Sequence, residues 1–210
     1  MISSSQSGLR HDLFIEGMGK LKEAALLMII GDLLVSFGSV SLFPLALGGF
    51  HALTIGLIPG ALVIVGFILV LVALYMHVVP SFEMLRDYKP EEYGTAATLV
   101  RIGYVWGAIL IIIGILTLII LIGAVLLLIG LILVLLGKIG LIIGMFKINE
   151  ETGESMFMIA GILFIIGLFV PFLSFISWIL IYIATDTAIA RYKSKIGPTT
   201  TESGESSEYI

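Results

Sequence analysis

The stretch LIGAVLLLIGLILVLLGKIGLIIGMFK (Leu121–Lys147) decides the fold class, because it is apolar along its whole length except for one internal charge, Lys138. About 20 consecutive apolar residues in a helix cross the roughly 30 Å hydrocarbon core of a bilayer. The apolar region extends back to residue 99, so residues 99–146 are too long for a single crossing. We place a tight turn near Leu121–Ala124, which predicts two adjacent membrane helices.

The composition of the whole chain is typical of a membrane protein. Of its 210 residues, 59% are hydrophobic and 12% are charged, and the mean hydropathy is +1.18. A soluble domain carries about 25% charged residues. The absence of cysteine excludes disulfides, thiolate metal sites and cysteine nucleophiles. The net charge of −4 argues against nucleic-acid partners. We therefore expect an all-α, multi-pass integral membrane protein in contact with the lipid bilayer.

Two further apolar regions precede this one. The first covers residues 24–43, and the second covers residues 57–79 and is followed by Pro80, which we expect to end its helix. The segment SFEMLRDYKPEEYG (Ser81–Gly94) is polar and is interpreted as a loop.

The last apolar region, residues 156–188, has two interpretations. It is either one kinked helix of roughly 50 Å or two shorter helices that meet at VPFLS (Val170–Ser174). Lys and Arg gather in four segments, namely the N-terminal arm (Arg10, Lys20, Lys22), the second loop (Arg86, Lys89), the fourth loop (Lys147) and the tail (Arg191, Lys193, Lys195). The positive-inside rule places all four on the cytoplasmic side and requires an even number of crossings. This favours six transmembrane helices arranged as three hairpins, and five helices with an external tail are the alternative.

The same reasoning divides the chain into three parts. Residues 1–23 form a cytoplasmic arm that lies partly along the interface, and residues 24–190 form the helical bundle. Residues 191–210 form a polar cytoplasmic tail without apolar periodicity, which we expect to be disordered. Tyrosines such as Tyr93 and Tyr192 lie near the predicted helix ends and are interpreted as interfacial anchors.

Glycines are spaced for close helix packing. They recur every seven residues in the third and fourth predicted helices, at Gly107, Gly114, Gly123, Gly130, Gly137 and Gly144. Small residues at such intervals let helix backbones approach closely in a membrane. The stripe packs either the third helix against the fourth or the chain against another subunit.

Four charges lie inside the predicted spans, at Asp32, Lys138, Arg101 and Asp186. With six spans, all four lie in the cytoplasmic half of the membrane and form a charge layer. Ionisable residues within a membrane usually face the bundle interior and find partners. We hypothesise an ion pair between Asp32 and Lys138. The alternatives are that Lys138 extends towards water while Asp32 faces headgroups or cytoplasmic water, or that these residues belong to a proton or ion pathway.

No catalytic pattern is present in the sequence. The three histidines, His11, His51 and His77, are far apart and lack partners at metal-ligand spacing. The acidic pairs and clusters, Glu91 with Glu92 and Glu150 with Glu151 and Glu154, are interpreted as solvated loops. We therefore expect no enzyme activity, no metal site and no cofactor.

Two segments carry a family resemblance: EGMGKLKEAALLMIIGDLL (Glu16–Leu34) and FVPFLSFISWILIYIATDTA (Phe169–Ala188). Together with the glycine-punctuated Leu/Ile spans, they resemble a family of multi-pass membrane proteins of unknown function from Sulfolobus-type archaea. The resemblance implies an archaeal plasma membrane and a hot environment. It assigns no catalytic or binding residue.

The function expected from the sequence is that of a structural or accessory component of the cell membrane, which packs as a homo-oligomer or with other membrane subunits. A small channel or transporter that uses the intramembrane charges is the alternative. Few Ser, Thr, Asn or Gln side chains are available to line a wet route through the predicted spans.

Overall fold

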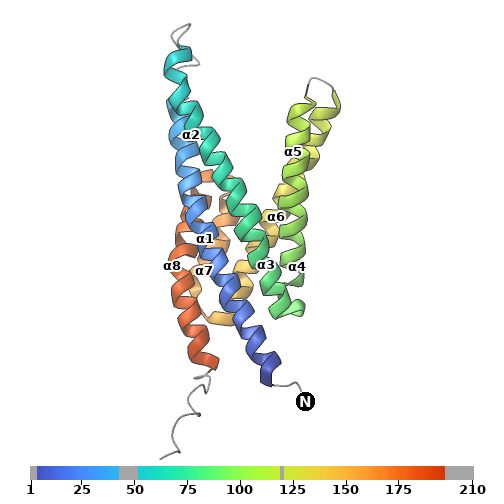
Figure 1. Cartoon of the computed structure of the whole chain (residues 1–210), viewed down its shortest axis with the longest axis vertical. Helices are drawn as coiled ribbons and strands as arrows, with labels where there is room; N and C mark the ends of the chain where they lie inside the picture. The colour runs from blue at the N-terminus through green and yellow to red at the C-terminus, as the bar shows by residue number, and fades with distance from the viewer. Residues whose placement is uncertain (1–3, 43–51, 119–120, 197–210) are drawn as a thin grey trace, which may run out of the picture.

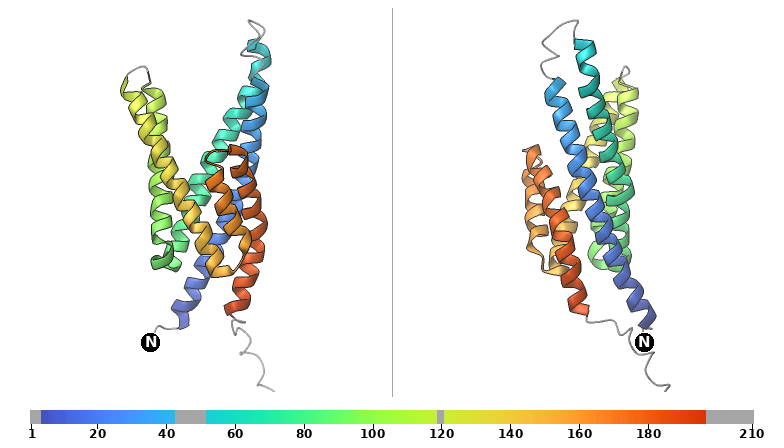
Figure 2. Two further views of the ribbon diagram at one scale, coloured as in Figure 1. Left: turned by 180° about the vertical axis from the view of Figure 1, so that it is seen from behind. Right: turned by 60° about the vertical axis from the view of Figure 1, so that its left-hand side comes forward.

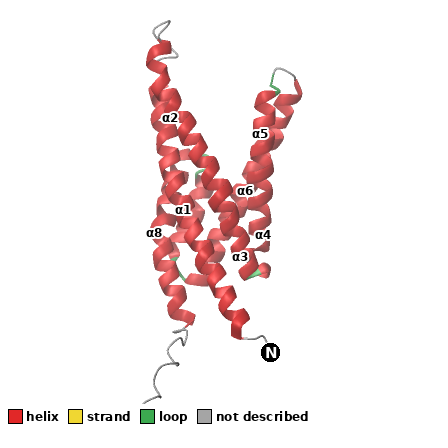
Figure 3. Cartoon of the chain, in the orientation of Figure 1, coloured by secondary structure: helices red, strands yellow, loops and turns green. Residues whose placement is uncertain are grey.

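The computed structural model describes residues 4–42, 52–118 and 121–196, which contain helices and short turns but no strand (Figures 1 and 3). The helices are α1 (Ser4–Leu42), α2 (Ala52–Val72), η3 (Ala73–Val78), α3 (Val79–Tyr88), α4 (Pro90–Arg101), η4 (Ile102–Trp106), α5 (Gly107–Leu116), α6 (Leu121–Thr152), α7 (Ser155–Ile166) and α8 (Pro171–Ile196). Segments η3 and η4 are π-helical and are continuous with their neighbours. The described residues therefore form six continuous helical stretches.

The all-α membrane bundle is confirmed. Five helical stretches are long and apolar enough to cross a membrane: Arg10–Ser41, Leu57–Tyr88, Pro90–Leu116, Leu121–Thr152 and Phe172–Lys195. The sixth stretch, α7, has 12 residues and is about 18 Å long, which is shorter than the hydrocarbon core.

The last apolar region folds as two helices, so the single kinked helix is wrong. Helix α7 ends at Ile166, and α8 begins at Pro171 after a turn. The tip of the α7–α8 hairpin lies nearer the terminal side of the molecule than the tips of the other two hairpins (Figure 2). The start of α1 and the end of α8 lie at one end of the bundle, which we call the terminal end (Figure 1).

A core of large side chains fills the terminal end. Its fully buried members are Phe14, Met18 and Leu21 from α1, Phe82 and Leu85 from α3, Tyr93 from α4, Leu141, Met145 and Ile148 from α6, Phe157 and Phe164 from α7, and Ile181 from α8. The loop predicted at Ser81–Gly94 is wrong, because only Lys89 lies between α3 and α4. Apolar residues spaced three or four apart give both short helices a buried face, and this burial overrides their polar composition.

Both ends of the chain are more helical than expected. Helix α1 runs without a break through the predicted arm, and Ser81 Oγ donates a hydrogen bond of 2.7 Å to the carbonyl of Gly17. Helix α8 continues to Ile196, so the first residues of the predicted tail are helical. The expected disorder of the remaining tail falls on residues 197–210, outside the described residues.

Two arms rise from the core and diverge (Figures 1 and 2). One arm is the distal half of α1 with α2, and the other is α5 with residues 121–137 of α6. Their helices meet at the π-helical segments, where Tyr75 Oη of η3 donates a hydrogen bond of 3.2 Å to the carbonyl of Val105 in η4.

Pro80 does not end its helix, contrary to expectation. A proline ring clashes with the carbonyl four residues earlier, which here belongs to Met76 inside η3. The wider π-helical turn accommodates this clash, so the chain continues as α3.

Candidate functional site

Lys138 lies where the arms meet, and its partner is a hydroxyl. Its Nζ donates a hydrogen bond of 3.1 Å to Ser174 Oγ on α8. The neighbouring Gly137 packs against Gly103 of η4, so Lys138 sits at the level of the π-helical crossing. The charges of Asp32 and Lys138 are close enough to influence each other electrostatically. Among the described residues, however, no ion pair within 4 Å joins them.

The other two predicted charges have partners of their own nearer the terminal end. Arg101 Nη1 lies 3.5 Å from Glu83 Oε1 on α3. Asp186 Oδ2 lies 2.6 Å from Lys22 Nζ on α1. Three of the four charges, Lys138, Arg101 and Asp186, thus make separate contacts, and the partners Lys22 and Glu83 were not foreseen from the sequence.

The glycine stripe packs within the chain. A Cβ added at Gly107 would lie 3.0 Å from the backbone nitrogen of Val134, and one added at Gly130 would lie 3.0 Å from the backbone nitrogen of Ile111. Added Cβ atoms at Gly114 and Gly137 would likewise meet the backbone nitrogens of Leu127 and Tyr104. One at Gly123 would meet the carbonyl group of Thr117, whereas Gly144 faces the ring of Phe82. The stripe is therefore used in the contacts of α6 with η4, α5, the following turn and α3.

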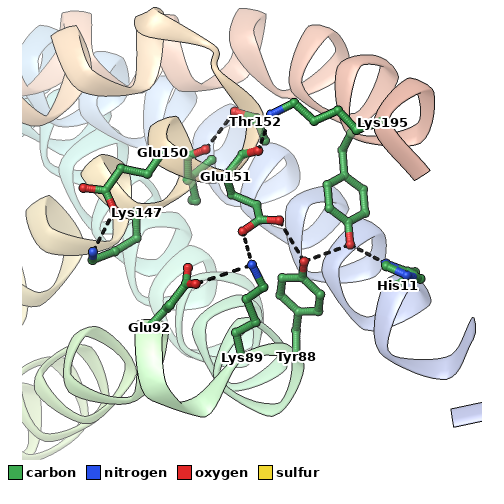
Figure 4. A network of polar contacts seen from close by, with 11 residues as sticks. His11, Tyr88, Lys89, Glu92, Lys147, Glu150, Glu151, Thr152 and Lys195 are labelled. Atoms are coloured by element: carbon green, nitrogen blue, oxygen red, sulfur yellow. Dashed lines mark hydrogen bonds and ion pairs between the residues drawn. The ribbon is translucent and has the colours of Figure 1, made fainter. Parts of the chain in front are cut away.

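The largest polar network lies at the terminal end and joins several helices (Figure 4). Glu151, near the end of α6, lies between Lys89 and Tyr88 (Figure 4). Its Oε2 is 2.5 Å from Lys89 Nζ, and its Oε1 accepts a hydrogen bond of 2.9 Å from Tyr88 Oη. Tyr192 Oη of α8 donates 3.0 Å to Tyr88 Oη, and His11 Nδ1 of α1 lies 2.5 Å from Tyr192 Oη.

The charge of Glu151 sets the direction of this hydrogen-bond chain. An ionised carboxylate only accepts, so Tyr88 donates its single hydrogen to Glu151 and Tyr192 donates its own to Tyr88. The ring nitrogen of His11 must then be the donor to Tyr192, which assigns a hydrogen to Nδ1. The network thus carries one ordered chain from α1 to α6.

Lys89, at the junction of α3 and α4, is the positive charge that pairs with Glu151 in this network. Burial acts to lower the pKa of Lys89, but the hydrogen bonds and charges of Glu151 and Glu92 outweigh it, so the pKa lies above its ordinary value of 10.5. Lys89 therefore remains charged at neutral pH and ties α6 to the start of α4.

A second group of contacts closes the α6–α7 turn against α8. Arg191 Nη2 lies 3.3 Å from Glu154 Oε2, and its Nη1 donates 2.7 Å to the carbonyl of Gly153. Lys195 Nζ donates 2.7 Å to the carbonyl of Glu151. Gly153 has φ of 74°, a conformation that favours glycine and permits the sharp turn.

Sequence reasoning missed this network because it treated Glu151, Glu154 and Lys89 as solvated loop residues. The tyrosines assigned to the membrane interface, Tyr93 and Tyr192, are instead buried in the core. The available signal was the apolar spacing of Phe82, Leu85, Tyr88, Tyr93, Ala96 and Val100, which predicts two short helices with buried faces.

Several charged residues at the terminal end are arranged in pairs and chains. Within residues 4–42, 52–118 and 121–196, no three His, Asp or Glu side chains lie close enough together to hold a metal ion. The hydroxyl of Tyr93 is fully buried and has no hydrogen-bond partner among the described residues. The arrangement is suited to holding helices together at one end of the bundle.

No curated protein and no solved structure matches this chain. A family model described as "Protein of unknown function (DUF973)" matches residues 14–208, which is most of the chain. The chain belongs to the DUF973 family of proteins of unknown function.

Proposed function

We propose that this protein is a structural or accessory component of a membrane assembly and has no catalytic activity of its own. The observation that supports this role is the divergence of the two arms above a terminal end held by polar contacts (Figure 1). Divergence leaves additional helix surface in the apolar half of the molecule.

The surface of the arms is apolar and suited to packing against another membrane helix. Large exposed side chains occur on both arms, including Phe37 and Val40 of α1, Ile64 and Phe67 of α2, Ile112 and Leu116 of α5, and Leu128 and Ile132 of α6. Membrane helices associate through van der Waals packing rather than a hydrophobic force, so an exposed apolar helix surface can pack against another helix. The partner is a membrane helix of a second copy or of another subunit.

Photo-crosslinking in growing cells tests this role. We replace Phe37 or Phe67, which are at least half exposed, with benzoyl-phenylalanine and irradiate. The expected result is one cross-linked product of defined mass. Peptide sequencing of this product should identify either another membrane protein or a second copy of this chain. Phe169, an exposed phenylalanine of the third hairpin, is the matched control and should give no protein product. Lipid adducts alone at Phe37 and Phe67 would contradict the proposal.

We place the protein in the cell membrane with both ends in the cytoplasm, and the family resemblance favours an archaeal membrane. The basic residues near the chain ends and the helix junctions support this orientation. A cysteine introduced at Ser206 of this cysteine-free chain tests it. The expected result is labelling by an impermeant thiol reagent only after the cells are opened.

Transport is the second candidate function, and the position of Lys138 favours it. The Lys138–Ser174 contact and the nearby charge of Asp32 lie at the level where the arms separate. Transporters place coupling charges near the bilayer midplane at the junction of moving parts. Proton flux in proteoliposomes, driven by a potassium diffusion potential and read by an internal pH dye, should fall on Lys138→Met if these charges form a pathway. Flux equal to that of empty liposomes for the unmodified protein would reject transport of protons.

A further inference from the structure

We propose that the α7–α8 hairpin is a re-entrant element, which enters the membrane from the terminal side and returns to it. Its tip, residues 167–172, is surrounded by lipid chains in the hydrocarbon interior. This inference concerns the surroundings of the hairpin tip, and it does not depend on the proposed function.

The length of the hairpin supports this position. No charged residue lies between Glu154, directly before α7, and Asp186, within α8. Helix α7, with 12 residues, is about 18 Å long, less than the roughly 30 Å hydrocarbon core. In both views of Figure 2 the tip lies lower than the tips of the other two hairpins.

The backbone amides of the turn form the hydrogen bonds that a medium without water requires. In hydrocarbon, an unsatisfied backbone group costs several kcal/mol, so a turn there must satisfy its own groups. Four consecutive amides donate to carbonyls of α7: Gly167 to Leu163, Leu168 to Ile165, and Phe169 and Val170 to Ile166. The next residue, Pro171, has no amide hydrogen.

The side chains of the tip are apolar and exposed. Phe169 is 84% exposed and Phe172 is 66% exposed, and Leu168 and Val170 are also exposed. The junctions at the terminal end are different, because Lys89 and Glu154 occupy them and both form ion pairs. Exposed phenylalanines with fully bonded amides suit lipid chains, whereas charged, paired junctions suit water.

The polar group near the tip faces the protein. Ser174 Oγ accepts the hydrogen bond from Lys138 and lies 3.5 Å from the carbonyl of Gly167, to which it donates. Inside the hairpin, Phe164 and Trp178 pack edge to face with their ring centroids 5.2 Å apart. The apolar side chains of the tip are thus directed outward while its hydroxyl is used internally.

Spin labels in the full-length chain test this proposal. We introduce one cysteine at Phe169, attach a nitroxide and reconstitute the protein in phosphatidylcholine liposomes. Collisions with oxygen, which concentrates in hydrocarbon, are compared with collisions with a water-soluble nickel chelate. The references are Leu128→Cys on the exposed surface of α6 and Glu150→Cys at the exposed terminal end. Phe172→Cys is a second label position in case Phe169→Cys disturbs folding.

The expected result at both label positions is oxygen accessibility similar to that of Leu128→Cys, with loss of the nickel accessibility measured at Glu150→Cys. Nickel accessibility as high as at Glu150→Cys would place the tip in water and overturn the proposal. Low accessibility to both reagents would place it against protein and would also overturn it.

Discussion

At the terminal end, the helices are joined by buried tyrosines and paired charges around large core side chains, whereas the helices of each arm are joined by glycines. The terminal network links α1, α3, α6 and α8 through directional hydrogen bonds. In the arms, the contact between α5 and α6 depends on backbones that approach closely. The comparison shows two solutions to helix packing: polar bonds where water is near, and close van der Waals contact where lipid surrounds the helices.

The two regions therefore respond to different changes. Loss of a polar partner should loosen the terminal end and leave the arms intact. An added methyl group should separate the helices at the base of an arm and leave the terminal hydrogen bonds intact. Four experiments test this separation.

The largest effect is expected from Gly103→Ala. A Cβ at this position would meet the backbone of Gly137, which cannot move aside as a flexible side chain would. Overpacking destabilises a protein by about 1–3 kcal/mol, occasionally more, and we expect the upper end of this range because the contact is with backbone. Reversible unfolding in mixed micelles measures the loss. Gly94→Ala in α4 is the matched control, because no atom lies within 4 Å of its added Cβ. An equal loss for both variants would contradict the close-packing explanation.

The next effect is expected from Glu151→Ala. The change removes the acceptor that Tyr88 and Lys89 share and leaves Lys89 only its 3.4 Å contact with Glu92, so we expect a loss of about 2 kcal/mol. Hydrogen exchange should accelerate around the α3–α4 junction and remain unchanged in α5. Glu150→Ala removes only the exposed pair with Lys147 and should cost about 0.5 kcal/mol or less. Equal acceleration in the arms would show that the two regions are not separate.

A smaller effect is expected from Tyr75→Phe, which removes the hydrogen bond between η3 and η4. The loss of stability should be about 1 kcal/mol. Spin labels on cysteines at Ile58 and Leu116, both exposed on different arms, measure the distance between the arms. We expect a broader distance distribution than in the parent chain. Tyr192→Phe, which alters only the terminal network, should leave the distribution unchanged.

The smallest effect near neutral pH concerns Lys89. Its pKa is raised above 10.5, so its ion pairs contribute stability that is complete below pH 10.5 and is lost only as the pH rises through the raised value. The free energy of unfolding should therefore show no loss from Lys89 between pH 7 and 10. Lys89→Arg should move the alkaline loss to higher pH. A loss near pH 9 in the parent chain that Lys89→Arg prevents would show that the pKa is not raised.

Long apolar segments made most of the helices predictable from the sequence, because bilayer thickness limits helix length. The distribution of Lys and Arg then favoured a break in the last apolar region. The glycine spacing likewise indicated close packing. The sequence did not predict the helical path through Ser81–Gly94, because burial by α1 and α6 determines it. Nor did it predict the partners of Lys138, Arg101 and Asp186, because each partner belongs to a helix distant in the chain.

The two π-helical segments also determine which faces of α3 and α4 point towards the core. A π-helical turn holds an additional residue, and each residue of an α-helix turns the chain by about 100°. Deletion of one residue within η3 would rotate α3 by that amount and direct Phe82 and Leu85 away from the core. Because η3 joins α2 to α3 and η4 joins α4 to α5, the face of each continuous helix that packs in the arm differs from the face that packs in the core. The extra residue in each π-helical turn thus keeps the core faces of α3 and α4 in register while the arms keep their own contacts.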